Sequence, residues 1–188
     1  GSPPLDGALL SRELDATFEV LLLPQGLVAA GEERELREAL GELCARLGDA
    51  PPVACHRDFM ARNLVPLADL AIGVLDHQDL RAGPRWYDLA SLANDSLFVP
   101  TSLAERWLER SGAVDGERTA YHRAAAQRGL KAAGTFARFA ARGVPRHLPL
   151  IPPTLRRALE HLALTPEGEG LAARLAPRWQ RELAKRLC

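Results

Sequence analysis

The feature that most constrains this fold is a change in hydrophobic period at Pro51-Pro52. Before it, residues 8–23 and 32–47 repeat apolar side chains every three to four positions, which is typical of amphipathic helices. Two consecutive prolines cannot continue a helix, and the short apolar runs that follow them are typical of strands. The sequence therefore predicts helices up to about residue 50 and a small β segment directly after them.

Residues 53–55 form a short apolar segment, and strands are predicted at 63–65 and 71–75, which flank a turn that contains a proline. Helix signals then return: a helix from Trp86 to about Leu97, a capping box at Ser102-x-x-Glu105, a long helix capped by Asp115 and running toward Gly143, and helix starts at Pro152 and Thr165. The predicted fold is mainly α with a small β-hairpin insert. We interpret Gly1-Ser2 as a cloning scar and residues 3–188 as a single domain.

Charge and cysteine content exclude several classes of protein. The 24 basic and 24 acidic residues balance, so no basic excess exists for binding nucleic acid by counterion release. No apolar run is long enough to span a membrane and no signal peptide is recognisable, which predicts a cytoplasmic protein without a membrane partner. Cys44, Cys55 and Cys188 are odd in number and widely spaced, which favours reduced thiols and no zinc site.

The main chemical motif lies in the β segment. His56-Arg57-Asp58 and Asn63 spell H-R-D-x-x-x-x-N, and Asp76 follows the apolar run 72–75. A hydroxyl that attacks a phosphoryl group must be oriented and must lose its proton, and a carboxylate within hydrogen-bond reach does both. Triphosphate-bound Mg²⁺ prefers hard oxygen ligands, which an amide and a second carboxylate supply. The pattern therefore predicts phosphoryl transfer.

The stretches HRDFMARNL and GVLDHQDLRAGPRWYDLASL resemble the C-terminal lobe of the aminoglycoside phosphotransferase-like kinases. Within that family the chain is most similar to bacterial kinases that phosphorylate the anomeric hydroxyl of N-acetylmuramate or N-acetylglucosamine. The details that carry this similarity are Arg62-Asn63, Asp76-x-Gln78-Asp79, Gly83-Pro84, Tyr87-Asp88-Leu89 and GLKAAGTFARFAARG at 129–143. The resemblance covers about residues 8–165.

The resemblance implies an ATP-dependent small-molecule kinase that acts on an amino sugar in cell-wall recycling. It implies that Asp58 is the catalytic base and that Asn63 and Asp76 bind Mg²⁺ and, through it, ATP. Asp88, with His56 and Arg57, would support the catalytic loop. Asp79 is left open between a substrate or second metal contact and a turn residue.

The chain departs from the family before the motif. Such kinases have an N-terminal lobe with a small sheet, a phosphate-covering loop and a nucleotide-gripping lysine. This chain reads as helical before residue 51 and has no lysine before Lys131. We therefore expect a kinase-like C-terminal lobe whose N-terminal lobe is missing, and no turnover by the chain alone.

Two alternatives remain. An aminoglycoside kinase needs an acidic pocket for its polycationic substrate. Here the extra acidic residues near the motif are accompanied by an equal number of arginines, which favours a neutral or anionic sugar as substrate. The acids are Asp69, Asp79 and Asp95, and the arginines are Arg62, Arg81 and Arg85. A non-catalytic kinase-like binding module is the second alternative, and the intact Asp58, Asn63 and Asp76 argue against it.

The remaining notable residues receive structural interpretations. Arg57 is expected to pair with a carboxylate, as buried arginines must. The tryptophans are expected in the core, and the remaining histidines on the solvated surface: Trp86, Trp107 and Trp179, and His122, His147 and His161. The G-x-G-x-x-A spelling at 168–173 follows no strand and is not interpreted as a nucleotide site.

Overall fold

The computed structural model describes residues 3–186. Its helices are α1 (Gly7–Thr17, continued by a π-helical turn, Phe18–Leu22), α2 (Glu33–Gly48), α3 (Tyr87–Ala93), α4 (Thr101–Arg110), α5 (Asp115–Ala141), α6 (Ile151–Leu162) and α7 (Leu171–Arg186). Its strands are β1 (Pro52–Cys55), β2 (Leu64–Pro66), β3 (Ile72–Val74) and β4 (Arg81–Pro84). The predicted mainly helical fold with a small antiparallel β insert is confirmed.

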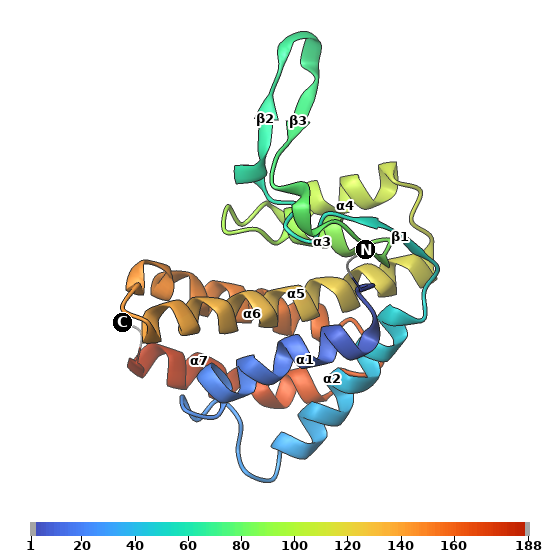
Figure 1. The fold of residues 1–188 in the computed structure, drawn as a ribbon. Coiled ribbons are helices and arrows are strands. Elements are labelled where there is room, and N and C mark those ends of the chain that lie inside the picture. The colour runs from blue at the N-terminus through green and yellow to red at the C-terminus, as the bar shows by residue number, and fades with distance from the viewer. Residues whose placement is uncertain (1–2, 187–188) are drawn as a thin grey trace.

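Helix α5 is the organising element of the body. It crosses the molecule with α6 alongside it, α1, α2 and α7 on one side and the β segment on the other (Figure 1). Small residues on its buried face allow neighbouring helices to approach closely. At Gly134, an added Cβ would lie 2.2 Å from Oγ1 of Thr17 on α1, so any larger residue would force α1 and α5 apart.

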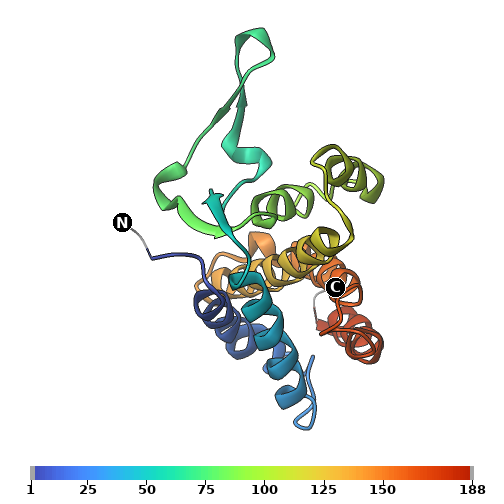
Figure 2. The same ribbon diagram turned by 90° about the vertical axis from the view of Figure 1, so that its right-hand side faces the viewer.

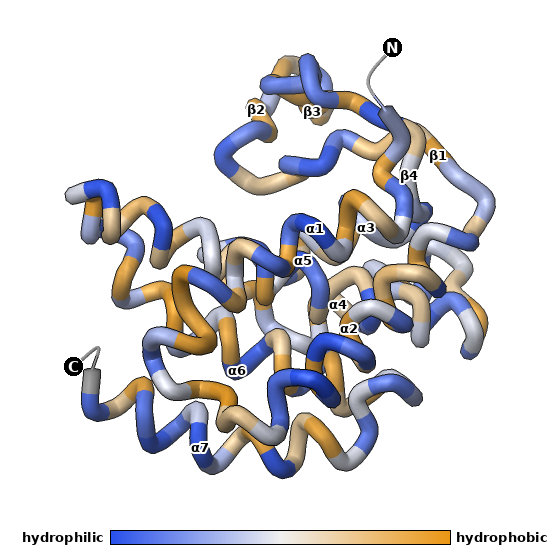
Figure 3. Tube along the Cα trace, turned by 60° about the horizontal axis from the view of Figure 1, so that its bottom comes forward, coloured by the Kyte–Doolittle hydropathy of each residue, from blue (hydrophilic) through white to orange (hydrophobic). Residues whose placement is uncertain are grey.

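The core is built from the apolar faces of these helices, and hydrophobic and hydrophilic stretches alternate along them (Figure 3). The leucines that the period predicts in the first two helices are buried: Leu10, Leu14, Leu36, Leu40, Leu43 and Leu47. Trp86 and Trp179 are buried as expected, and the indole N–H of Trp179 donates to the Leu27 carbonyl at 2.9 Å. Trp107 packs against the core from its edge.

The β segment forms two separate antiparallel pairs. β1 pairs with β4, with Cys55 opposite Arg81, and β2 pairs with β3, with Leu64 opposite Val74. The β2–β3 hairpin stands away from the body in two perpendicular views (Figures 1 and 2). Strand β4 is not predicted from the sequence, because Arg81-Ala82-Gly83-Pro84 carries no alternating apolar pattern. It extends because its backbone completes the hydrogen bonding of β1.

Four predicted helix boundaries are wrong. The helix start expected at Thr165 lies at Leu171, where α7 begins after a series of turns. The helix that starts near Trp86 ends at Ala93, well before Leu97. The Ser102-x-x-Glu105 capping box does not form, because α4 begins after Pro100 and the Glu105 carboxylate accepts from Arg118 at 2.6 Å. The residue that caps α5 is Val114 and not Asp115, and its backbone N–H donates to Glu117 Oε2 at 3.2 Å.

The prediction that the remaining histidines are solvated is wrong for His122 and His161. Their Nδ1 atoms lie 3.0 Å apart where α5 packs on α6, and Nε2 of His161 lies 2.9 Å from Oδ1 of Asn94. Burial, together with the neighbouring charges of His122 and Arg157, lowers the pKa of His161 to about 3. His147 is half-buried and stacks on Phe136. The helix packing, which local spacing does not encode, brings these rings together.

No helix between residues 3 and 186 is both long and apolar enough to cross a bilayer.

Candidate active site

One carboxylate holds the start of the loop that follows β1 through hydrogen bonds. Asp88, in the first turn of α3, accepts the backbone N–H of His56 at 2.6 Å and that of Arg57 at 2.9 Å, one on each oxygen. Hydrogen bonds to an ionised acceptor are stronger than neutral ones. Asp88 therefore fixes the start of the loop.

A second carboxylate fixes the end of the same loop. Asp95, which is buried, accepts the backbone N–H of Ala61 at 3.0 Å, in the short 3₁₀ turn that ends at Asn63. The Nδ2 of Asn63 donates to the backbone carbonyl of Asp58 at 2.8 Å. The sequence marks Asp95 only as an acid near the motif, whereas in the structure it shapes the loop.

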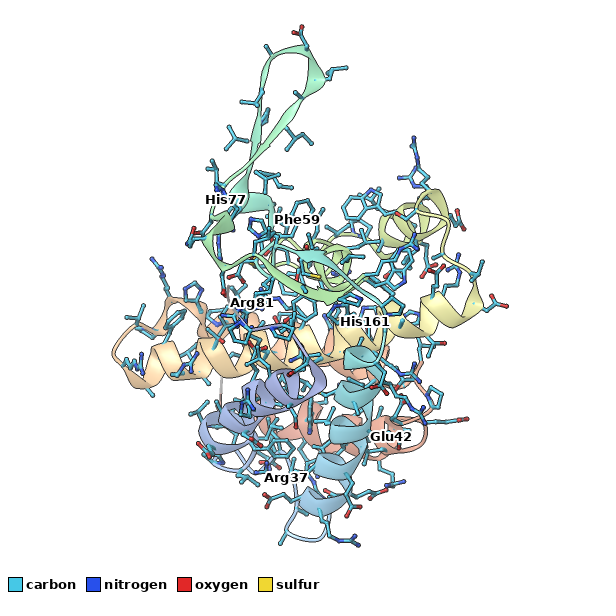
Figure 4. All side chains as sticks on the ribbon, turned by 45° about the vertical axis from the view of Figure 1, so that its right-hand side comes forward. Arg37, Glu42, Phe59, His77, Arg81 and His161 are labelled. Carbon is cyan, nitrogen blue, oxygen red and sulfur yellow. The ribbon has the colours of Figure 1, made fainter. Side chains whose placement is uncertain are left out.

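One side-chain and one backbone hydrogen bond tie Leu75, the residue before Asp76, to this loop. The ring Nε2 of His56 donates to the Leu75 carbonyl at 2.8 Å, and the Leu75 N–H donates to the Asn63 carbonyl at 2.9 Å. Asp76 follows in the left-handed conformation, with φ of 65°, and its exposed carboxylate accepts from Gln78. Figure 4 shows His77, the next residue, at the base of the β2–β3 hairpin.

The side chain of Asp58 is held by a residue that the sequence does not single out. Its Oδ1 accepts from Arg128 Nη2 at 2.8 Å, and Arg128 is itself fixed by a bond of 3.0 Å from its Nε to Ser91 Oγ. Arg128 is buried, while the Asp58 side chain is 45% exposed. The available signal was a charged residue within the small and apolar run 124–134 of α5. A buried arginine needs an anionic or polar partner.

Arg57 lies at the centre of an ionic network beside Asp58. It has a φ of 72°, and its guanidinium donates to Asp79 and, at 2.6 Å, to Glu13 on α1. Glu13 also accepts from Lys131 at 2.7 Å, and Asp79 accepts from Arg81 at 2.8 Å. The expected carboxylate partner of Arg57 is therefore present twice, and Glu13 is a participant that the sequence does not predict. Figure 4 shows Arg81 above α5 and α1.

Asp79 lies within this network. Burial alone would raise the pKa of Asp79, but the Arg81 hydrogen bond and the charges of Arg57, Arg81 and Lys131 outweigh it and lower the pKa. The carboxylate is thus held ionised by cations that occupy both of its oxygens.

The two described cysteines are unsuited to chemistry. Cys44 and Cys55 are free and buried, and burial raises the pKa of each thiol to about 12, with a smaller contribution from Glu13 and Asp88 respectively. A neutral buried thiol is neither a nucleophile nor a metal ligand. Cys188 lies outside the described residues.

The donor set suits one kind of metal ion. Within residues 3–186, no three His, Cys, Asp or Glu side chains gather as a metal site. Mg²⁺ does not need such a cage, because it binds through one or two protein oxygens together with substrate phosphates and water. Asn63 and Asp76, on backbone segments joined by the Leu75 to Asn63 hydrogen bond, fit that requirement.

The comparisons with known proteins agree with the class of protein that this site defines. The sequence profile of the phosphotransferase enzyme family matches residues 3–126, and the chain belongs to that family. It is 35% identical over 166 residues to the N-acetylmuramate/N-acetylglucosamine kinase of Pseudomonas putida, covering 80% of this chain and 49% of that protein. The kinase of the same name from Pseudomonas aeruginosa is 32% identical over 190 residues, covering 93% and 56%.

A third kinase of that name, from Neisseria meningitidis serogroup B, is 35% identical over 156 residues, covering 71% of this chain and 46% of the relative. The chain spans about half the length of these curated relatives.

Proposed function

We propose that the chain is the C-terminal, substrate-side lobe of an ATP-dependent kinase that phosphorylates the anomeric hydroxyl of an amino sugar in cell-wall recycling. The observation that carries the proposal is the anchored loop: Asp88 and Asp95 hold its two ends, Asn63 donates to the Asp58 carbonyl, and the backbone of Leu75, the residue before Asp76, bonds to that of Asn63. Membership of the phosphotransferase family and the names of the similar kinases support it.

In this proposal Asp58 orients the acceptor hydroxyl and takes its proton. Arg128 occupies Oδ1 of Asp58 and fixes the plane of the carboxylate, which leaves Oδ2 for the hydroxyl. The amide nitrogen of Asn63 is used by the loop, so its oxygen is the atom for Mg²⁺, with Asp76 as the second ligand. When bound, Mg²⁺ neutralises phosphate charge as it develops during transfer.

The charges around the loop favour a sugar over an aminoglycoside. A polycationic substrate needs free carboxylates, but Asp79 is bound by two arginines and Asp95 by the backbone of Ala61 and Ser96. The remaining extra acid, Asp69, lies on the exposed hairpin. The aminoglycoside kinase is therefore the weaker alternative.

The exposed hairpin supports the view that another lobe supplies the grip on the nucleotide. Large apolar side chains on and beside β2 and β3 are exposed, among them Leu67, Leu70, Ile72 and Val74. Contiguous exposed apolar residues mark surfaces that contact something else. We propose that a lobe outside these 188 residues covers this surface and carries the cover and the lysine for the triphosphate.

The test is an assay of the 188-residue chain and of the whole protein from which it derives, using Mg-ATP and a panel of amino sugars. We expect phosphorylation only by the whole protein, with N-acetylmuramate or N-acetylglucosamine among its substrates. Full activity of the short chain would overturn the two-lobe proposal. Inactivity of both, with sugar binding intact, would favour the binding module.

A further inference from the structure

A groove of about 640 Å³ lies between α6 and α7. Its floor is apolar and is formed by Leu159, Trp179 and Leu183, while small residues form much of its walls. None of its lining residues belongs to the β segment or to the loop that follows β1. Both helices lie in the body, apart from the β2–β3 hairpin (Figures 1 and 2). The groove is therefore separate from the candidate active site.

The α6 wall of this groove has the spacing of a helix-packing seam. It carries Pro153, Arg156, Glu160 and Ala163, at intervals of three, four and three residues. Such intervals place side chains in one row along a helix and are typical of the contact between two packed helices. Arg156, Glu160 and Ala163 are nevertheless exposed. The row is thus a packing surface that no helix within residues 3–186 covers.

The α7 wall is made of small side chains that leave room for another helix. Its exposed residues recur every three or four positions: Ala173, Ala176, Gln180 and Ala184. Short side chains at a contact allow two helix axes to approach closely. A different flank of α7 already packs within the chain, because Arg174 and Arg178 donate to Glu35 and Glu32 beside α2. The free flank of α7 is the one that faces the groove.

The two charged side chains of the α6 row have no ionic partner among the described residues. Arg156 and Glu160 lie four positions apart on one helix, but neither forms an ion pair within residues 3–186. On the neighbouring helix, by contrast, Arg123 binds Glu167 at 2.7 Å. The groove therefore presents one unpaired cation and one unpaired anion beside an apolar floor.

The order of residues along the α6 row makes the row complementary to itself. Residues 156 and 160 are symmetric about position 158, and so are residues 153 and 163. If two α6 helices run antiparallel about a two-fold axis at this level, Arg156 of each copy faces Glu160 of the other. Pro153 likewise faces Ala163. A two-fold interface joins the same patch on both copies, so it requires this kind of symmetry.

We propose that the α6–α7 groove is the interface of a homodimer, in which the α6 row of each copy lies in the groove of the other. A second copy supplies, by symmetry, an acid and a base in the order that the row requires. The Arg156–Glu160 pair then occurs twice in each dimer. This inference goes beyond the proposed function and does not depend on it.

The test measures the self-association of the whole protein by sedimentation velocity over a range of concentrations. Arg156→Glu and Glu160→Arg each place like charges opposite one another at both pairs, so each should raise the dimer dissociation constant about 100-fold. The double variant Arg156→Glu/Glu160→Arg exchanges the two charges and should dimerise about as tightly as the wild type. The matched control is Arg106→Glu, an exposed arginine of α4 outside the groove, which should change nothing.

A mixture of the two single variants gives the sharpest outcome. One variant presents two acids in the row and the other two bases, so a mixed dimer regains both pairs and should form in preference to either homodimer. Circular dichroism checks that each variant is folded, as expected for exposed positions.

Three results would overturn the proposal: a wild type that is monomeric at every concentration, single variants that dimerise like the wild type, or a mixture without mixed dimers. The first of these is also what coverage of the groove by another part of the protein, or by a different partner, would give. None of these measurements requires phosphoryl transfer, so failure of the proposed function would leave them unaffected.

Discussion

The helical body and the segment that carries the phosphotransferase motif are held together by different forces. In the body, buried leucines of α1, α2 and α6 pack against α5, and the structure depends on apolar surface removed from water. In the segment 52–84, by contrast, the strands have three or four residues each, and Arg57 and Asp76 adopt left-handed conformations that side chains disfavour. That backbone is held by carboxylates on α3 and on the turn after it, Asp88 and Asp95.

The difference implies that the helical body determines the global stability, whereas the polar anchors of the segment 52–84 determine the geometry of the site. A change in the body should lower the free energy of unfolding everywhere, because the core is shared. A change in the polar anchors should loosen the loop locally, because each anchor bonds only one or two backbone groups. The following predictions test that separation, beginning with the largest expected effect.

The sharpest separation is expected at Asp58. In the whole protein, Asp58→Asn should lower turnover by about 10²–10⁴-fold, the usual contribution of a positioned general base. Folding should be retained, because the asparagine oxygen can still accept from Arg128. Steady-state kinetics and thermal unfolding measure the two effects, and Asp69→Asn on the exposed hairpin is the control. Near-wild-type turnover would remove Asp58 from the role of base.

Leu155→Ala and Asp88→Ala compare the two regions directly. Leu155 is fully buried on α6, so its truncation should cost about 2–5 kcal/mol of global stability. Removal of Asp88 leaves the N–H groups of His56 and Arg57 without their acceptor and should mainly speed their hydrogen exchange. Urea unfolding and exchange measured by NMR distinguish the outcomes. If both variants lowered the global free energy of unfolding equally, the proposed separation of the two regions would be wrong.

Two glycines of α5 test the close packing of the body. Gly134→Ala should destabilise by about 1–3 kcal/mol, because the new methyl group overlaps Thr17. Gly116→Ala has open space around its Cβ and should stabilise by about 0.4–1 kcal/mol through the unfolded chain. Denaturant midpoints measure both. A harmless Gly134→Ala would mean that α1 and α5 can separate at no cost.

The last prediction concerns pH and the buried ring pair His122 and His161. The pKa of His161 falls from its ordinary 6.5 to about 3 on folding, so the unfolded chain binds the extra proton. The stability that this histidine contributes is present above pH 6.5 and is lost as pH falls toward 3. His122, whose pKa is also lowered by burial, acts in the same direction. Urea unfolding between pH 7 and pH 4 should show a shallower decline in His161→Leu, and identical slopes would contradict the assignment.

Much of the body was predictable because its information is local. Leu10, Leu14, Leu36 and Leu40 recur with the helical period, and because such a period places them on one face of a helix, it predicts that this face is buried. The motif His56-Arg57-Asp58 with Asn63 was equally readable, since order and spacing along one loop are properties of the chain. Boundaries were less certain because capping depends on competing partners, as the pairing of Glu105 with Arg118 illustrates.

What the sequence by itself determined is therefore the helical period, the break at Pro51-Pro52 and the residues of the phosphotransferase motif. Only the tertiary structure decided which side chains surround that motif. Arg128 is 70 residues from Asp58, and Lys131 is 118 residues from Glu13, yet each pair is in contact. The physical reason is that these contacts depend on how α5 packs against α1 and the motif loop, and packing depends on the shapes of whole helix faces rather than on spacing along the chain.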